Sequence, residues 1–495
     1  MPFLLLLVLI LACLWHDWPQ PLAWVGGVGT PALATALTWL GAVGLVAAAA
    51  VLARTTCRRL RRDPAQCEAV LRRYRAWRSY HWLAQLAFYA VALFILGWGW
   101  AVQSLGPADA SGKAVMLPGG ELLLLAPLVA TLLLSWACFY DVDRTLHALV
   151  PAADGFHPFQ GRLAYVGFQA RQKLALISIP LGLLILAQGL QWFSSPKNED
   201  GLELAVIGLL AGAFVALPWI LRLVLRLRPL PAGPLRDRLL AACGRLNFRC
   251  SNLLLWDTHD HVANAMVVGL VPWLRYVIFT DRLLHELSPD ELEAVLGHEA
   301  GHVRHRHMPY YLGFLFISLA VVASLWALAA AHLLDMPAPA DQSLEMLPLF
   351  AILGGYIFVV FGFLSRRCER QADIFGCRAV SCARGDCTGH EPDVQVLPGG
   401  RGLCPTGIRT FVSALEKVGA LNGIHRHRPG WLQSWQHSTI ARRVQFMERL
   451  LADPTLEPRF QRRVGLVKWG LLLALGAVLF ILVLTPEGRA GLLGL

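Results

Sequence analysis

The sequence predicts a mainly α-helical, polytopic membrane protein with about eight or nine transmembrane helices and a folded domain outside the lipid. Composition is the first reason: of 495 residues, 56% are hydrophobic and 16% are charged, whereas soluble domains are about 45–50% apolar and about 25% charged. Long apolar runs are the second reason. The third is that two long polar stretches, 226–309 and 365–464, interrupt these runs.

The apolar runs predict the membrane spans, because about 20 such residues cross the hydrocarbon core. A shorter run at 3–15 is expected to be one more helix, since no Lys or Arg precedes it and no small-residue cleavage site follows, as a signal peptide requires. The eight longer runs are 22–53, 80–103, 122–139, 174–193, 204–225, 310–334, 346–364 and 465–484.

The basic residues that give the net charge of +11 are distributed along the chain as a membrane topology predicts. Nine Arg lie in 54–79 and four basic residues in 141–173, whereas the linkers around Lys113 and Lys197 carry one each. Lys and Arg concentrate in cytoplasmic loops. We therefore expect a protein of the cell inner or plasma membrane that does not bind nucleic acid, with both polar stretches in the cytoplasm.

The chain is expected to have five segments, and its chemistry to lie in the polar ones. The spans carry almost no ionisable side chains, which argues against transport. The predicted segments are a multi-span domain at 1–225, a polar segment at 226–309, a helix pair at 310–364, a second polar segment at 365–464, and a last span with its tail at 465–495.

The stretch HEAGHVRHRH, residues 298–307, contains a metal-binding pattern. Ser288 and Glu291 form a predicted capping box, so a helix begins just before it. His298 and His302, four residues apart, share one face of that helix, and their imidazoles can bind one zinc at about 2.0–2.1 Å. Glu299 between them suits a base that acts on a metal-activated water.

Two further histidines follow the motif and are not expected to be ligands. His305 would lie about 10 Å along the helix axis from His298. His307 is expected on the opposite face. Both precede Pro309 in a last helical turn, where cations suit the helix dipole and the membrane surface.

A third ligand is expected from ERQAD, residues 369–373. Two predicted crossings, 310–334 and 346–364, return the chain to the side that it left. Glu369 can therefore meet the two histidines, and Asp373, one turn later, can accept the free N–H of one of them. The alternative for Glu369 is an ordinary charge on a surface helix.

The order of HEAGH, two spans and ERQAD resembles the family of membrane zinc metalloendopeptidases that includes HtpX and the CAAX prenyl proteases. The likeness covers about 236–450. His437-Ser438-Thr439-Ile440-Ala441-Arg442-Arg443-Val444 is similar to the family element His-Pro-x-x-x-x-Arg-Ile, with Ser438 in place of proline. The family carries fewer spans before its motif.

The resemblance implies a cytoplasmic zincin-like domain with a small β-sheet, one catalytic Zn²⁺ and a protein or peptide substrate. It implies that Glu299 is the general base and that His437 and Arg443 steady the oxyanion or bind substrate; a helix cap is the alternative for His437. Asn264 would grip a substrate backbone beside a strand at 276–280. The metal ligands implied are His298, His302 and Glu369, with Asp373 behind them.

The predicted function is hydrolysis of membrane-associated or misfolded membrane proteins by an integral-membrane zinc endopeptidase whose other partner is the bilayer. Two alternatives remain: trimming of lipid-modified C-termini, and a metal-binding scaffold or sensor without catalysis. Glu299 favours an enzyme, because it adds nothing to metal affinity.

A cysteine-rich insert follows ERQAD. In a cytoplasmic compartment such a cluster indicates metal more than disulfides. A second, structural zinc is one interpretation, and an irregular loop with reduced thiols is the other. The candidate ligands are Cys377, Cys382, Cys387, His390 and Cys404.

Overall fold

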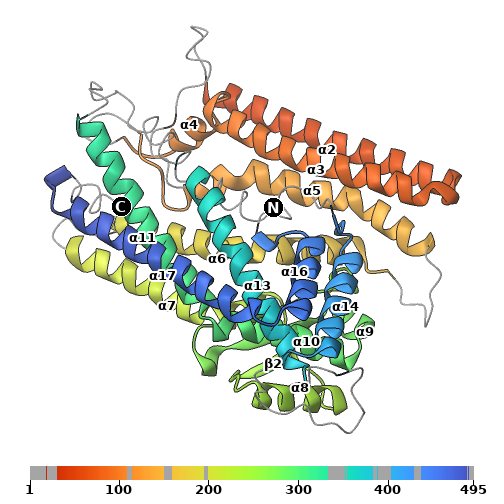
Figure 1. Ribbon diagram of the computed structural model, residues 1–495. Coiled ribbons are helices and arrows are strands. Elements are labelled where there is room, and N and C mark those ends of the chain that lie inside the picture. Colours follow the sequence, from red (N-terminus) through yellow and green to blue (C-terminus); the bar gives the residue numbers. More distant parts are fainter. Residues whose placement is uncertain are drawn as a thin grey trace. The chain divides into compact units, whose positions relative to one another are not determined.

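The computed structural model describes residues 18, 30–108, 114–149, 159–193, 199–332, 352, 354–382, 387, 403–427, 436–487 and 489 (Figure 1). The chain forms two compact units, Met1–Phe214 and Val215–Leu495. Each unit is described by itself below. The finer division into five segments stays a prediction.

The first unit is helical, with α2, α3 and α5 lying side by side along their length (Figure 1). Its core includes Leu124, Leu128 and Leu132 of α5. The predicted span 80–103 is two helices here, because Gly97 adopts φ +77° between them. The elements are α2 Pro31–Arg62, η2 Pro64–Gln66, α3 Cys67–Phe94, α4 Trp98–Gln103, α5 Gly120–Leu149, α6 Arg162–Phe193 and α7 Glu199–Val224, which runs into the second unit.

The second unit contains the predicted small sheet, in the order β1-β2-β4-β3. Strands β2 and β4 are parallel, and β3 is antiparallel to β4 at the sheet edge. All five side chains of β4 are buried, on alternating faces: Val277 and Phe279 pack in the cluster that contains Leu292 and Leu296 of the metal-binding helix, whereas Tyr276 and Ile278 belong to a separate cluster. The strands are β1 Arg228–Pro229, β2 Asn252–Trp256, β3 Ala265–Val268 and β4 Tyr276–Thr280.

Helices α10 and α13 of the second unit pack unusually closely, because small residues line their contact. A Cβ added to Gly297 would lie 2.4 Å from the Cβ of Ala379, and one added to Gly301 would lie 2.9 Å from the Cα of Ala372. These pairs run in opposite directions along the chain, so the helices are antiparallel. The elements are α8 Pro234–Arg245, η4 Pro272–Leu274, α9 Asp281–Glu286, α10 Pro289–Arg304, α11 His307–His332, the π-helical turn η5 Ile357–Phe361, α13 Gly362–Ala379, α14 Pro405–Leu421, α16 Ile440–Ala452 and α17 Leu456–Val483.

The chain is a multi-pass membrane protein. Among the described residues, four helices are long and apolar enough to cross a bilayer: α2, α5, the part of α11 at His307–Ala329, and α17. Helices α11 and α17 pack together through Tyr310, Phe314 and the apolar residues of α17. The expected helix at 3–15 and much of the expected span 346–364 lie outside the described residues.

Candidate metal centre

Helix α10 begins as predicted. The Ser288 hydroxyl accepts from the Glu291 N–H at 3.3 Å, and the Glu291 carboxylate accepts from the Ser288 N–H at 2.8 Å. Lys417 and Ser413 of α14 donate to the same carboxylate at 2.8 and 2.7 Å. Burial alone would raise the pKa of Glu291, but these hydrogen bonds lower it. The start of α10 is thereby fixed against α14.

The structure brings His298, His302 and Glu369 together. The Nε2 atoms of the two histidines lie 3.3 Å apart. Glu369 on α13 places its oxygens 3.8 Å from Nε2 of His298 and 3.7 Å from Nε2 of His302. Donors bound to one tetrahedral zinc at about 2.0–2.1 Å would be about 3.3–3.4 Å apart. The donor set and its spacing therefore fit zinc.

The buried ion pair of Asp373 and Arg443 lies against Nδ1 of His298, the ring nitrogen that is not offered to the metal. Its Nδ1 lies 3.0 Å from Asp373, whose side chain is fully buried. Arg443 of α16 binds the same carboxylate through two nitrogens. Burial would raise the pKa of Asp373, but Arg443 and His298 lower it. Asp373 therefore stays anionic and keeps the Nδ1 proton of His298 pointing away from Glu369.

Glu299 lies beside the three candidate metal ligands, His298, His302 and Glu369, and faces the sheet. Its carboxylate accepts from the backbone N–H of Val267 on the edge strand β3 at 3.2 Å. Burial raises the pKa of Glu299 to about 7, against the lowering effect of His298. A carboxyl group with such a pKa can both accept and return a proton near neutral pH.

His437 and Arg443 both contact Glu369 but come from a different part of the chain. His437 Nδ1 lies 3.1 Å and Arg443 Nη1 3.8 Å from its Oε2. The side chain of His437 is 59% exposed, so it can also meet solvent or a ligand. The cap of α16 is Thr439, which does not support the helix-cap alternative for His437. Ser438 has φ +64°, a value closed to the proline that the resembled family carries there.

Asn264 lies immediately before β3. Its backbone N–H donates to the Thr280 hydroxyl at 2.9 Å, and its carbonyl accepts from the Thr280 N–H at 3.0 Å. Its side chain is exposed. Within the described part of the chain, no contact joins this side chain to the three donors. Its predicted role in substrate binding stays a prediction.

His307 was expected on the opposite face of the helix, and that expectation is wrong. Helix α10 ends at Arg304, Arg306 adopts φ +53°, and α11 starts at His307, so the helical phase is reset. The fully buried His307 places Nδ1 3.0 Å from Nδ1 of His302. The sequence does carry a signal for a new helix here, because Pro309 lies in the first turn of α11, where proline is favoured.

The contacts of His307 fix the tautomer of His302. If Nε2 of His302 serves the metal, its Nδ1 carries the hydrogen and donates it to His307. Nε2 of His307 then donates to the Gln371 side chain at 3.2 Å, and the Gln371 amide donates to Gln461 at 2.6 Å. Burial lowers the pKa of His302 to about 4, which keeps it neutral, as a ligand must be.

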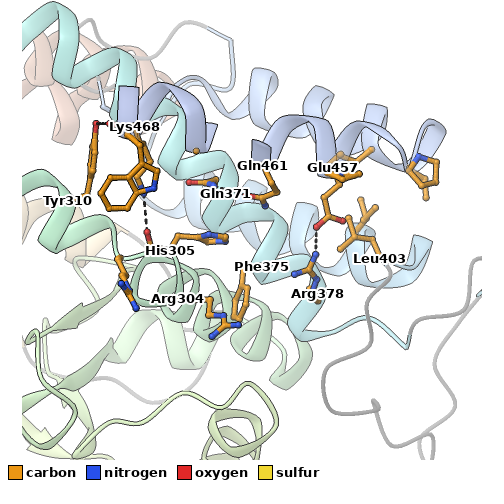
Figure 2. A pocket seen from close by; sticks show the side chains of 18 of the residues that line it. Arg304, His305, Tyr310, Gln371, Phe375, Arg378, Leu403, Glu457, Gln461 and Lys468 are labelled. Carbon is orange, nitrogen blue, oxygen red and sulfur yellow. Dashed lines mark hydrogen bonds and ion pairs between the residues drawn. The ribbon is translucent and has the colours of Figure 1, made fainter. Parts of the chain in front are cut away.

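A cavity of about 1280 Å³ lies next to this chain of hydrogen bonds but is not the metal centre (Figure 2). Arg304, His305, Gln371 and Lys468 line it, and none of the three donors does. Figure 2 shows Lys468 reaching toward His305, whose carbonyl accepts from Nζ at 3.0 Å. His305 thus faces this cavity and not the donors.

The structure assembles only part of the predicted cysteine cluster. The sulfurs of Cys382, Cys387 and Cys404 lie within 4.8 Å of one another. Cys377 is in the core of α13 instead, where its sulfur lies 3.5 Å from that of Met447. His390 lies outside the described residues.

Comparison with known proteins agrees with the geometry. The profile of Peptidase family M48 matches residues 240–428. The "CAAX prenyl protease 1 homolog" of Dictyostelium discoideum is 30% identical over 158 residues, which are 29% of this chain and 36% of that protein. The chain thus matches about a third of the length of this curated relative. The crystal structure of S. mikatae Ste24p has a TM-score of 0.39 and 15% identity, covering 84% of this chain and 98% of that one.

The matched segment contains HEAGH and ERQAD, the two motifs that supply the three donors. His437 and Arg443 follow it in the sequence. The predicted family is confirmed: residues 240–428 of this chain are a peptidase domain of family M48, a family of zinc-dependent metallopeptidases.

Proposed function

We propose that the chain is an integral-membrane zinc endopeptidase. The observation that carries the proposal is the convergence of His298, His302 and Glu369 from two helices, with Glu299 beside them at the edge strand. These three side chains would hold zinc, which when bound supplies Lewis-acid activation of a water and of the peptide carbonyl. Asp373 and His307 orient the two imidazoles from behind.

Glu299 would move the proton. It takes a proton from the attacking water and gives it to the leaving amine. Its contact with Val267 sets it against β3, where a peptide can add as a further strand through its backbone. Asn264, at the start of β3, would hold that peptide. His437 and Arg443 would steady the negative charge that develops on the carbonyl oxygen.

The position of His307 supports a site that acts at a membrane surface. The ring of His307, the first residue of the candidate span α11, contacts His302 directly. This contact supports a substrate that is anchored in the bilayer close to the site. The basic loops at 54–79 and 141–173 favour a cytoplasmic orientation. Membrane-associated or misfolded membrane proteins are the proposed substrates.

Trimming of lipid-modified C-termini is the second candidate. One observation favours it: the D. discoideum relative is named a CAAX prenyl protease 1 homolog. The two candidates differ in what they require. The first tolerates many peptide sequences, whereas the second needs a prenyl group on the substrate.

Glu299→Gln tests the enzyme. We expect the variant to keep zinc, since Glu299 is not among the three donors, and to lose cleavage of an unfolded membrane protein in proteoliposomes. A general base is worth about 10²–10⁴-fold in rate. Glu286→Gln, on the surface helix α9, is the matched control and should cleave as the wild type does.

Two results would contradict the proposal. Cleavage at the wild-type rate by Glu299→Gln would remove the mechanism, and no cleavage by zinc-loaded wild type would favour a scaffold or sensor. Running the same assay with a C-terminal peptide, with and without a prenyl group, separates the two substrate classes. Peptides that accumulate uncut in membranes of cells carrying Glu299→Gln would then identify natural substrates.

A further inference from the structure

We propose that Cys382, Cys387 and Cys404 form a second metal site, a structural thiolate site for zinc, separate from the catalytic donors. The three sulfurs lie within 4.8 Å of one another. Sulfurs bound to one tetrahedral zinc at about 2.3 Å would be about 3.8 Å apart, so shifts of at most about 1 Å would bring these three sulfurs to that spacing. The thiols come from both ends of the insert that follows ERQAD.

Among the residues that the structure describes, the three side chains lie outside the larger apolar clusters. Their exposed fractions are 8%, 8% and 0%, and they form a buried cluster of their own. Cys377, by contrast, is buried among the apolar residues of α13, α14 and α16. Within the described part of the chain these thiols are buried chiefly against one another, and thiols buried in this way gain little from apolar packing. A shared metal explains their convergence.

The sulfur of Cys404 accepts a hydrogen bond at the start of a helix. Cys404 is the N-cap of α14, and its sulfur accepts from the Gly407 N–H at 3.2 Å. The Cys387 thiol donates to the Thr406 hydroxyl at 3.4 Å, and that hydroxyl donates to the Cys387 carbonyl at 3.3 Å. A helix N-terminus and N–H donors stabilise a thiolate. Zinc binding would release the thiol protons, and the charge on the Cys404 sulfur would then lie beside the Gly407 N–H.

The site joins two helices of the catalytic centre. The Cys404 N–H donates to the Ser381 hydroxyl at 3.1 Å, and that hydroxyl donates to the carbonyl of Cys377 at 2.8 Å, near the end of α13. Helix α13 carries Glu369. Helix α14 carries Phe411, whose ring stacks on His298 with centroids 6.0 Å apart. A metal at the thiols would therefore fix both helices around the catalytic donors.

The site is tested by measuring the zinc content of the whole chain. The protein is purified in detergent under reducing conditions. We expect two zinc ions per chain in the wild type. Cys382→Ser with Cys404→Ser should lose one ion, and His298→Ala with His302→Ala should lose the other. Cys67→Ser, at the first residue of α3 in the other unit, is the matched control and should keep both.

X-ray absorption at the zinc edge gives a second measurement that needs no cysteine variant. The His298→Ala, His302→Ala protein should show a sulfur shell at about 2.3 Å. The site is refuted if this protein binds no zinc, or if the cysteine variant keeps both ions. A wild type with sulfur-bound zinc alone would instead refute the proposed catalytic site, so the two proposals fail separately.

Discussion

His307 and Asp373 contact the outer nitrogens of the two metal-binding histidines in different ways. Asp373 is an anion held by Arg443, whereas His307 is a neutral ring held by Gln371. Both leave Nε2 of the histidine available to the metal. Partners of this kind are worth about 10–100-fold in metal affinity. These contacts thus orient the two imidazoles of the proposed ligands.

Replacing His307 tests how much its contact with His302 contributes to zinc affinity. We expect His307→Phe, which keeps a ring but accepts no hydrogen bond, to bind zinc about 10–100-fold more weakly by competition with a chelator. His307→Asn offers an acceptor and should recover part of the loss. His305→Phe is the control, because His305 faces the cavity and not His302. Equal losses in the Phe and Asn variants would indicate a packing defect instead.

At the scale of the element, the close contact of α10 and α13 places a carboxylate opposite two imidazoles. Gly297 and Gly301 permit this contact, since a side chain at either position would meet Ala379 or Ala372. Both glycines lie inside a helix, where glycine costs about 1 kcal/mol relative to alanine. The two glycines thus lie at the positions where α10 and α13 are nearest, although glycine lowers the stability of the helix.

Gly301→Ala should therefore destabilise the domain although it improves helix propensity. The added Cβ would be 2.9 Å from the backbone of Ala372, and such overpacking costs about 1–3 kcal/mol. We expect a lower thermal midpoint and weaker zinc retention, because α13 must move away with Glu369. Gly244→Ala in α8 is the control; its Cβ would meet nothing within 4 Å. A Gly301→Ala protein with wild-type zinc affinity would contradict this account.

The motif residues were predictable from sequence because helical periodicity is local. Spacing placed His298 and His302 on one face, and an even number of crossings brought Glu369 back to them. His307 was not predictable in this way, since the left-handed residue Arg306 resets the helical phase. The same applies to the break at Gly97 within 80–103. Sequence spacing could not show which cysteines converge. Cys377 is excluded from the cluster because it packs against Met447, a contact between residues far apart in the sequence.

At the scale of the whole molecule, the catalytic proposal requires one topology. The segments with HEAGH and ERQAD must face the same compartment, because their side chains share one donor set. Helix α11 leaves that compartment, and the chain must return before α13. This requirement is independent of which compartment it is.

Accessibility labelling tests the topology. Single reporter tags inserted in the exposed turn at Asp260 and after His427 should report the same side of the membrane in intact cells. A tag in the linker around Lys113 serves as the control for the opposite side, as the distribution of basic residues predicts. Tags at Asp260 and His427 on opposite sides would be incompatible with a shared ion.

From the contact between His307 and His302 we expect the activity to be sensitive to the lipid environment. His307 is the first residue of the candidate span α11, so a change in the tilt of that helix would alter the hydrogen bond of the proposed ligand His302. Tilt changes with hydrophobic mismatch. Proteolysis in vesicles of defined acyl-chain length should pass through an optimum thickness, and the His307→Asn variant should shift it. A rate independent of chain length would show that α11 tilts without moving His307.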